Sequence, residues 1–557
     1  MKVENIVIVG GGSSGWMTAA ALLKCCPWTN VILIESDKPT VGVGESTLGH
    51  FNKYLKALGL EDKDWMPKCN ATYKNSIQFT DFREKETVFQ YPFGKYDYND
   101  TIEGMKDWFD LARMNPEEYP PESFAEFFNK ENSALVKHNK QWDNRDNRWR
   151  NFNWLTDVAY HLDAEKFAEY LRDEYCDNFD DRFTHIRGEV RGSVKDINAG
   201  GSPAVSNRYI KQLAVRLNED NRTVGVIGDL FIDCTGFKSV LLEEYMGTRF
   251  IKFNDLANDK AFFARIPYVT QEEREKHMHN VTDCQAAENG WLWSIPLWNR
   301  IGVGYCWSSR FAMETETRTE FETWIEQKYG VSPDQYEVGT IDIKHGYHEK
   351  AWNLNVVAIG LSYGFVEPLE STGLLTTHEN ILRLVDVLSR RKGYVTQIER
   401  NWYNYAAQRE VIGFSKFVAM HYALSQRTDN PYWRWCSQRN EYMTEQFDGF
   451  VRVNDNYERL GSSLDLDQTM DVNMNGMNYI AAGQGMMLGR DWYSDRDPDE
   501  LTFVENSHLK YSKEVNDFVE SDDCPTHYEY LRDYIYGGDE LRAELIKKEK
   551  ERTKILS

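Results

Sequence analysis

The sequence predicts a mixed α/β fold, because strand and helix patterns alternate at its start around a glycine-rich turn. Residues 6–9 and 30–35 are short apolar runs of the kind that form buried strands. Between them lie the glycine-rich residues 10–15 and the helix-like residues 16–24. This order of strand, glycine turn, helix and strand is typical of a Rossmann-type βαβ unit that binds a dinucleotide.

The glycine turn has the composition of a phosphate-binding loop. Glycines in a G-x-G-x-x-G pattern permit a tight turn, a close approach to a pyrophosphate and close packing of the helix on the strand. An acid stands about 20 residues later, where such sites bind the ribose hydroxyls. The residues expected to contact the dinucleotide here are Gly10, Gly12, Ser13, Ser14, Gly15 and Glu35.

Composition excludes several classes of protein. The chain has 557 residues, of which 41% are hydrophobic and 14% aromatic, so it is long enough to bury a core in more than one lobe. A net charge of −23 argues against nucleic-acid binding. The nine cysteines are scattered without a C-x-x-C pair, which predicts reduced thiols and no metal site. Without a signal peptide or an apolar run of ~18 residues, we expect a cytoplasmic protein that does not bind membranes.

Further segments suit the same nucleotide site. Residues 41–48 form a strip of small and polar residues that lets the backbone lie along an extended cofactor, although an ordinary surface turn has the same composition. Residues 189–194 and 224–233 resemble strands, and the second leads into a glycine turn at residues 234–237. The additional candidates for cofactor contact are Gly42, Val43, Gly44, Glu45, Val190, Gly236 and Gly360.

A second candidate site lies in residues 360–373. An apolar run precedes this segment and a helical pattern follows it, and the loop between them holds Glu367 and Glu370 on either side of a Pro-Leu pair. Free N–H groups of Thr372 and Gly373 at the start of the helix are suited to bind an anion. Alternatively, Ser371 or Thr372 only caps the helix.

Lys74 lies among small and apolar neighbours, which would desolvate its charge if the segment is buried; a solvated surface lysine is the ordinary alternative. Residues 81–153 are aromatic and irregular, and we interpret them as an insert that either lines a binding cleft or packs on the surface. Residues 159–173 have the pattern of an amphipathic helix, in which His161 is expected to be structural.

Residues 289–296 alternate as a strand does, which places Trp291 and Trp293 on one face. These tryptophans form either an aromatic core ladder or a wall between two compartments. Because no repeats or linkers appear, we expect interleaved lobes: a core at residues 1–400 that contains the insert, and a mainly helical substrate-side region at residues 401–557.

Taken together, these motifs resemble those of the flavin-dependent halogenases of the tryptophan-halogenase type. The resemblance rests on the glycine turn followed by Trp16, the segments at residues 42–45 and 366–373, Lys74 after a tyrosine, and a W-x-W-x-I-P motif at residues 291–296. It extends to about residue 435. The W-x-W-x-I-P motif separates these enzymes from the hydroxylating flavin monooxygenases, whose FAD-binding core they share.

The resemblance implies a reaction and a set of roles. Reduced FAD from a separate flavin reductase, oxygen and a halide ion (chloride, bromide or iodide) would give hypohalous acid, with the halide held at Thr372 and Gly373. The acid would pass through a tunnel to Lys74, which holds it by a hydrogen bond or as a haloamine. Glu370 would orient the oxidant and accept the ring proton, with Glu367 the second choice.

The substrate implied is a small electron-rich aromatic such as an indole, a phenol or tryptophan. Phe93 stands where an aromatic sandwich residue is expected, Trp433 is a looser candidate, and Ser371, Trp291 and Trp293 would line the substrate side and the tunnel. Assembly into a homo-oligomer is left open. The alternatives are a flavin-dependent hydroxylase and a degenerate flavoprotein without catalysis.

Overall fold

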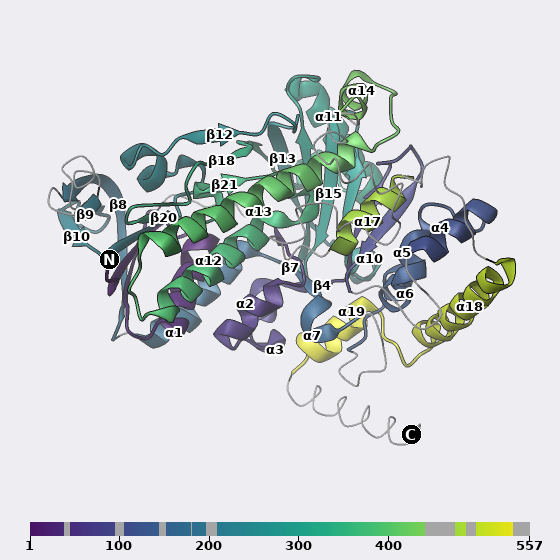
Figure 1. The fold of residues 1–557 in the computed structure, drawn as a ribbon, viewed down its shortest axis with the longest axis horizontal. Coiled ribbons are helices and arrows are strands. Elements are labelled where there is room, and N and C mark those ends of the chain that lie inside the picture. The colour runs from purple at the N-terminus through teal and green to yellow at the C-terminus, as the bar shows by residue number, and fades with distance from the viewer. Residues whose placement is uncertain are drawn as a thin grey trace. The chain divides into compact units, whose positions relative to one another are not determined.

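The computed structural model describes residues 1–37, 45–94, 105–143, 152–179, 181–196, 209–439, 474–485 and 497–538. The chain divides into two compact units, each assembled from three separate stretches. The first unit comprises Met1–Cys69, Leu162–Leu256 and Ile343–Ser415, and the second comprises Asn70–His161, Ala257–Asp342 and Lys416–Ser557. Figure 1 shows the helices and strands of both units.

The first unit is built on an eight-stranded sheet with a parallel centre. Five strands, β8, β2, β1, β11 and β20, run parallel, whereas β10, β9 and β19 pair antiparallel at the edges. The order is β10 (Thr223–Ile227), β9 (Tyr209–Leu217), β8 (Phe183–Asp196), β2 (Asn30–Glu35), β1 (Asn5–Val9), β11 (Leu230–Asp233), β20 (Val356–Ala358) and β19 (Trp352–Asn353). Its central strands are apolar and buried, as parallel strands covered by helices are. The predicted βαβ unit and the mixed α/β fold are confirmed.

Helix α1 (Ser13–Cys25) is the central helix of this unit. Its residues from Gly15 to Leu23 are all buried, and three consecutive alanines let neighbouring helices approach closely. It contacts α12 (Thr372–Arg390) and α2 (Phe51–Leu58). The start of α12 is therefore held against a rigid element of the nucleotide-binding sheet.

The helix predicted for residues 159–173 is wrong in its first part. Residues Ala159–Leu162 form strand β7, and helix α8 (Ala164–Tyr170) begins only after Asp163, whose carboxylate accepts a hydrogen bond from the N–H of Lys166 at 3.2 Å. The strand forms because β7 pairs with β4 (Thr72–Lys74), with Lys74 opposite Ala159. This long-range pairing outweighs the local helical pattern.

The second unit contains a seven-stranded, mainly antiparallel sheet. Its order is β17 (Val338–Asp342), β13 (Lys260–Pro267), β16 (Arg300–Trp307), β15 (Gly290–Pro296), β14 (Val281–Ala286), β5 (Ser76–Thr80) and β6 (Val88–Pro92). Helix α11 (Glu314–Tyr329) contributes Phe321 and Ile325 to the core formed with β13 and β16. Every residue of β15 and β16 is buried, so the predicted strand with the two tryptophans lies in the interior.

Helices make up most of the rest of the second unit. Among the described residues they include α4 (Met105–Met114), α5 (Ser123–Phe128), α6 (Lys130–Lys137), α14 (Pro431–Ser437), α17 (Met474–Gly483), α18 (Pro498–Glu520) and α19 (His527–Tyr530). The predicted boundary at residue 400 falls inside α13 (Gln397–Ala423). The division into a core and a substrate-side region stays a prediction.

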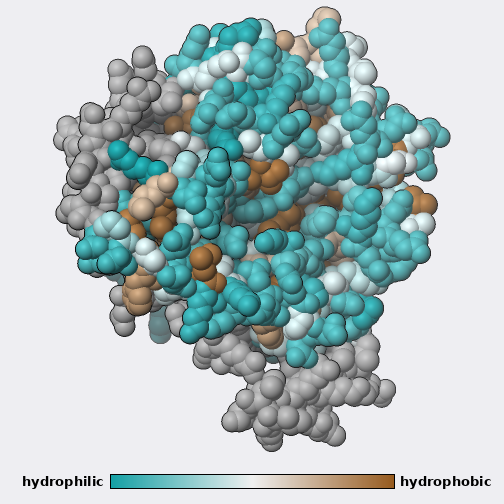
Figure 2. Space-filling view, turned by 90° about the vertical axis from the view of Figure 1, so that its right-hand side faces the viewer, coloured by the Kyte–Doolittle hydropathy of each residue, from teal (hydrophilic) through white to brown (hydrophobic). Residues whose placement is uncertain are grey.

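The face drawn in Figure 2 is mainly hydrophilic, with small, separated hydrophobic patches. This surface agrees with the net charge of −23. Among the described residues, no helix combines the length and the hydrophobicity that crossing a membrane requires.

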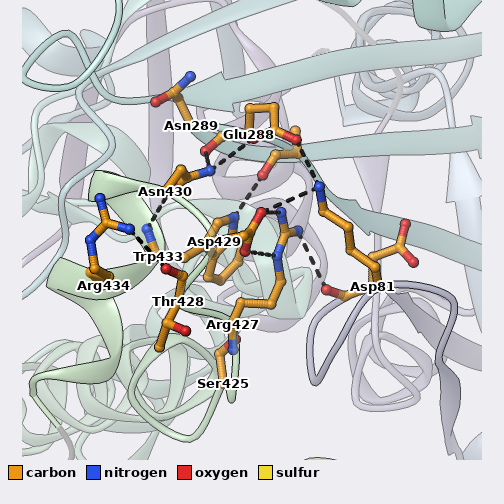
Figure 3. A network of polar contacts seen from close by, with 12 residues as sticks. Asp81, Glu288, Asn289, Ser425, Arg427, Thr428, Asp429, Asn430, Trp433 and Arg434 are labelled. Atoms are coloured by element: carbon orange, nitrogen blue, oxygen red, sulfur yellow. Dashed lines mark hydrogen bonds and ion pairs between the residues drawn. The ribbon is translucent and has the colours of Figure 1, made fainter.

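An ion pair between the buried Arg427 and the partly exposed Asp429 joins three turns of the second unit (Figure 3). Arg427 binds Asp429 through two hydrogen bonds of 3.1 and 2.9 Å, and its guanidinium lies 4.6 Å from the centre of the Trp433 ring. Lys85, from the turn between β5 and β6, lies 3.3 Å from Asp429 and 3.2 Å from Glu288. Because Glu288 stands just before β15, the network fixes the start of the strand that carries the two tryptophans.

We expect Asp429→Asn to lower the free energy of unfolding by about 1 kcal/mol at pH 7. Hydrogen bonds from Arg427 lower the pKa of Asp429 from 3.8 to about 2. The stabilisation is therefore present above pH 3.8 and is lost as the pH falls toward 2. One third of the side chain is exposed (33%), so solvent screening reduces the ~2 kcal/mol that the pKa difference alone implies. Urea unfolding at pH 7 and pH 3 measures the effect.

Asp220→Asn is the matched control, because Asp220 pairs with Arg222 on the surface, where 36% and 74% of the two side chains are exposed. This variant should leave the unfolding midpoint unchanged at both pH values. An equal loss in the two variants, or a loss in Asp429→Asn that is undiminished at pH 3, would contradict the assignment.

Candidate active site

Three neighbouring strands of the first unit are followed by glycines with positive φ. Gly10 follows β1 with φ +119°, Gly236 follows β11 with φ +67°, and Gly360 follows β20 with φ +69°. A Cβ on Gly10 would lie 2.2 Å from the carbonyl oxygen of Cys234, so no side chain fits where the chain leaves β1. Open parallel sheets bind ligands outside the carboxyl ends of their strands, and these three turns form that edge.

Helix α1 begins at this edge without a side-chain cap. Gly12 precedes the helix, no capping hydrogen bond from a described side chain is present, and the first turn, which starts with Ser13 and Ser14, holds no acid. Gly15 is required by packing, because a Cβ there would lie 1.9 Å from the carbonyl oxygen of Gly10. A helix start of this kind offers N–H donors and a positive dipole to phosphate oxygens.

The carboxylate of Glu35 lies on the glycine loop. Its Oε2 accepts a hydrogen bond from His185 Nε2 at 2.9 Å. Burial raises the pKa of Glu35, but hydrogen bonds from His185 and Trp16 and the charge of His185 hold that pKa below its ordinary value. A Cβ on Gly11 would lie 2.3 Å from the Glu35 side chain. The sequence analysis did not predict that His185, Trp16 and Gly11 contact the Glu35 side chain. Only Gly11 could have been suspected from the local sequence, because it lies in a Gly-Gly-Gly run.

The other candidates for cofactor contact are placed only in part. Three of them lie outside the described residues: Gly42, Val43 and Gly44. Glu45 begins the short strand β3 (Glu45–Ser46), where burial, followed by the charge of Asp163, raises its pKa to about 7. Val190 is partly buried in β8, next to an irregularity in the pairing with β9.

The loop at residues 360–373 buries both of its carboxylates. Glu367 and Glu370 are 0% and 1% exposed. Ser371, between Glu370 and the start of α12, adopts the left-handed conformation with φ 56°, which is costly for a residue other than glycine. Its hydroxyl does not cap the helix; it donates to the hydroxyl of Ser46 at 3.0 Å. The capping alternative for Ser371 is therefore not realised.

A hollow of about 270 Å³, counting space open to solvent, lies against this loop and the first turn of α12. Only a small part of it is enclosed, with room for roughly one water-sized species. The lining residues are Gly360, Leu361, Gly364, Phe365, Val366, Thr372, Gly373, Thr376 and Val411. The first turn of α12 holds no acid, and a Cβ added to Gly373 would meet no atom within 4 Å. The geometry suits a small anion at the helix start.

Lys74 is buried in the second unit. Its side chain is 0% exposed at the end of β4, and Nζ lies 5.1 Å from the centre of the Phe93 ring. This position excludes a solvated surface lysine. Burying an ammonium is costly, which makes the fully buried Lys74 a candidate for a functional residue.

His161 lies in β7, directly beside the strand of Lys74. Its Nε2 is 2.8 Å from Thr282 Oγ1, and its Nδ1 is 3.4 Å from the hydroxyl of Thr72, which itself donates to the carbonyl of Pro296 at 2.7 Å. Burial and then the charge of Lys74 hold the pKa of His161 well below its ordinary value. His161 is thus a neutral, hydrogen-bonded histidine, which agrees with a structural role.

Trp291 and Trp293 lie in contact on β15, with ring centres 5.7 Å apart. Trp293 lies over Gly304 of the neighbouring strand, where a Cβ would come within 2.0 Å of the indole ring. Trp433 is also fully buried, and its indole N–H donates to the carbonyl of Ala287 at 2.8 Å. These contacts favour a structural role for Trp433.

A glycine-lined carboxyl edge on a parallel sheet, in one chain with a second, antiparallel sheet, is the architecture of a dinucleotide-binding enzyme. Residues 5–489 match the family model for tryptophan halogenase. The chain belongs to this family and is a flavin-dependent halogenase, an oxidoreductase.

Individual relatives agree with the family. The chain is 30% identical over 452 residues to the tryptophan 6-halogenase SttH of Streptomyces toxytricini, covering 77% of this chain and 80% of that protein. It is 29% identical over 457 residues to the tryptophan 7-halogenase RebH of Lentzea aerocolonigenes, covering 78% of each. The apo structure of VirX1 is 47% identical, with a TM-score of 0.83 over 96% of this chain and 100% of that one.

We expect Gly11→Ala to weaken FAD binding without unfolding the protein. The new methyl group would push the Glu35 side chain away from the glycine loop and would remove the acid from the position proposed for ribose recognition. Losing a hydrogen bond to a charged group costs about 1.5–3 kcal/mol, so the Kd for FAD should rise at least about tenfold. Quenching of flavin fluorescence measures the Kd.

Gly192→Ala serves as the control for this variant. Gly192 lies in β8 of the same unit, and a Cβ there would meet no atom within 4 Å. The control should bind FAD as the unmodified protein does. Unchanged FAD affinity in Gly11→Ala would remove Glu35 from the site.

Proposed function

We propose that this halogenase transfers a halogen from hypohalous acid to a small electron-rich aromatic molecule, with Lys74 and Glu370 as catalytic residues. The observation that carries the proposal is the complete burial of Lys74, with Nζ 5.1 Å from the Phe93 ring. An ammonium held in a dry, aromatic environment makes hypohalous acid more electrophilic by donating to its oxygen, an effect that a solvated lysine cannot match.

The family implies FAD as the cofactor, and the carboxyl edge of the first sheet fits it. Three features support this proposal: glycines with positive φ permit a close approach of the backbone, the start of α1 has N–H groups suited to a pyrophosphate, and Glu35 lies beside the glycine loop, where it is proposed to bind the ribose. When bound, reduced FAD reacts with oxygen and supplies the oxidising power that converts halide to hypohalous acid. We propose that a separate flavin reductase delivers the reduced FAD.

The halide is assigned to the N–H groups of Thr372 and Gly373. The hollow at the start of α12 has room for roughly one small species, and the helix dipole favours an anion there. Gly373 has no side chain to fill this space. A Cβ there would meet no protein atom within 4 Å, so packing does not explain why the residue is a glycine. Ser371 is proposed to line the path of the oxidant.

The proposed transfer conserves atoms and charge. The halogen–oxygen bond of hypohalous acid breaks as a carbon–halogen bond forms on the ring. The leaving hydroxide takes a proton from the Lys74 ammonium and departs as water, and the proton that Glu370 removes from the ring replaces the one that Lys74 gave up. Glu370, which is 1% exposed, accepts the ring proton from the cationic intermediate and restores aromaticity. Lys74 acts either as a hydrogen-bond donor or as a haloamine, and both forms need the same nitrogen.

The substrate is proposed to be an indole, a phenol or tryptophan. The relatives SttH and RebH are named tryptophan 6-halogenase and tryptophan 7-halogenase, which makes tryptophan one candidate. The ring of Phe93 beside the Lys74 ammonium supplies an aromatic surface on which a flat substrate can stack. Trp291 and Trp293 are proposed to separate this substrate from the cofactor.

The decisive experiment is a mass-spectrometric screen of pooled indoles, phenols and tryptophan with the purified protein, FAD, a flavin reductase, NADH and oxygen. Chloride, bromide and iodide are tested separately. Lys74→Met preserves most of the side-chain volume and removes the charge, so we expect it to retain FAD binding while product formation falls at least about a hundredfold. Enzyme-free reactions control for free hypohalous acid.

The screen separates the alternatives. A halogen mass shift that needs Lys74 supports the proposal and identifies the halide and the substrate class. Insertion of oxygen in place of halogen would reassign the protein as a hydroxylase. FAD binding without product under any halide would point to a degenerate flavoprotein, and full activity of Lys74→Met would remove Lys74 from the mechanism.

Gly373→Ala tests the halide site by itself. The added methyl group clashes with no protein atom, and alanine is favoured over glycine inside a helix, so the fold should be retained. We expect the KM for halide to rise at least about tenfold, the scale on which one methyl group changes binding in a close-fitting pocket. Gly192→Ala is again the control, and equal KM values for halide in the two variants would place the anion elsewhere.

A further inference from the structure

A group of buried residues with amide side chains lies around Phe93 and around Asn75, the residue that follows Lys74. All belong to the second unit, and each is at most 1% exposed: Asn75, Asn129, Asn132, Gln141 and Asn280. None of these five residues was predicted from the sequence to have a function. Five buried amides around two candidate active-site residues need a physical explanation, because apolar side chains would fill the same space without a desolvation cost.

Asn132 connects the two candidate residues directly. Its Nδ2 donates to the carbonyl oxygen of Asn75, the residue after Lys74, at 2.7 Å, and to the carbonyl oxygen of Phe93 at 2.9 Å. Both acceptors are carbonyls, so the amide cannot be turned over without losing both bonds. Asn132 thus links the backbone beside Lys74 to the backbone of Phe93, in addition to the direct hydrogen bond between the N–H of Phe93 and the carbonyl of Asn75.

The other four residues contact Phe93 or Asn75 through side chains or backbone groups. Asn129 Nδ2 donates to the carbonyl of Phe93 at 2.8 Å, and the N–H of Phe93 donates to the carbonyl of Asn75 at 2.9 Å. The side chain of Asn75 pairs with that of Gln141 through two hydrogen bonds of 3.0 and 3.3 Å. The N–H of Asn75 donates to the carbonyl of Asn280 at 2.7 Å.

The start of helix α6 places Asn132 in this network. Asn129 caps the helix by accepting a hydrogen bond from the N–H of Asn132 at 3.4 Å, and both residues lie within the aromatic insert at residues 81–153. The insert therefore contributes the groups that hold Lys74 and Phe93 in place.

We propose that Asn132 is a positioning residue that determines where on the aromatic ring the halogen is placed. The inference rests on the proposed roles of Lys74 and Phe93. Lys74 holds the oxidant and Phe93 holds the ring, so the spacing between their backbones decides which ring carbon meets the halogen. A displacement of about 1 Å is enough to change the rate at one carbon by about a hundredfold.

Asn132→Leu is the variant that tests this role. Leucine has a similar volume and no donors, and each carbonyl keeps another partner, because Asn75 still accepts from Phe93 and Phe93 still accepts from Asn129. The variant should therefore fold. The probe is phenol with bromide, since the ratio of ortho to para product reports position and free hypobromous acid supplies the ratio without an enzyme.

We expect Asn132→Leu to shift the ortho to para ratio toward that of free hypobromous acid. The KM for phenol should rise and kcat/KM should fall about tenfold or more, while the Kd for FAD and the KM for bromide stay unchanged. Asn258→Leu is the matched control: Asn258 is a 1% exposed amide of the same unit that hydrogen-bonds Tyr422 and Tyr432, with no hydrogen bond to Asn75 or Phe93 in the described structure.

An unchanged product ratio and KM in folded Asn132→Leu, or the same changes in Asn258→Leu, would overturn the inference. If Asn132→Leu fails to fold, Gln141→Leu replaces it, because it removes the side-chain partner of Asn75 and should shift the ratio in the same direction. Failure of the proposed function is recognised separately. In that case the unmodified protein brominates neither phenol nor indole, or Lys74→Met retains activity, and the inference about Asn132 falls with it.

Discussion

The sealed charge of Lys74 is the constraint on which the second unit depends. An ammonium in the protein interior costs several kcal/mol even after the surroundings relax, so the surrounding structure must supply compensation. His161, one strand away, is held neutral by burial and by the charge of Lys74 itself, so no second cation competes for the same space. The backbone that follows Lys74 is fixed by hydrogen bonds from buried groups, among them the amide of Asn132, which donates to the carbonyl of Asn75.

The candidate sites of the first unit depend on unusual backbone conformations. Gly10 and Gly360 turn the chain at the ends of parallel strands, where any side chain would be strained. Ser371 adopts the left-handed conformation although it is not a glycine, at a cost of about 1–2 kcal/mol. That turn separates the carboxylate of Glu370 from the N–H group of Thr372. The groups proposed as proton acceptor and as anion site are therefore separated by a single residue with left-handed backbone conformation.

The sequence predicted the parts of the fold that local patterns determine. The βαβ unit, the strand at residues 290–296 and the helix after residue 371 needed only periodicity, glycine spacing and burial. The helix expected from residue 159 was wrong because residues 159–162 pair with the strand of Lys74, a contact between distant parts of the chain. The partnership of Glu35 with His185 was missed for the same reason. The catalytic roles of Lys74 and Glu370 were predicted from the resemblance to flavin-dependent halogenases. Their burial supports these roles, which stay predictions.

A diffusible halogenating agent can also react with the protein that makes it. The two tryptophans of β15 are side chains at risk of this reaction. Indole rings are themselves electron-rich and react with halogenating agents. Trp291 and Trp293 therefore stay unmodified only if their reactive carbons are covered. Both rings are nearly sealed, at 1% and 6% exposure, and Trp293 lies against Gly304, whose missing side chain lets the strand cover one face of the ring. Tight packing therefore limits the access of an oxidant to these two rings, and in its proposed role the ammonium of Lys74 would give the oxidant a more favourable place to bind than the aromatic core does.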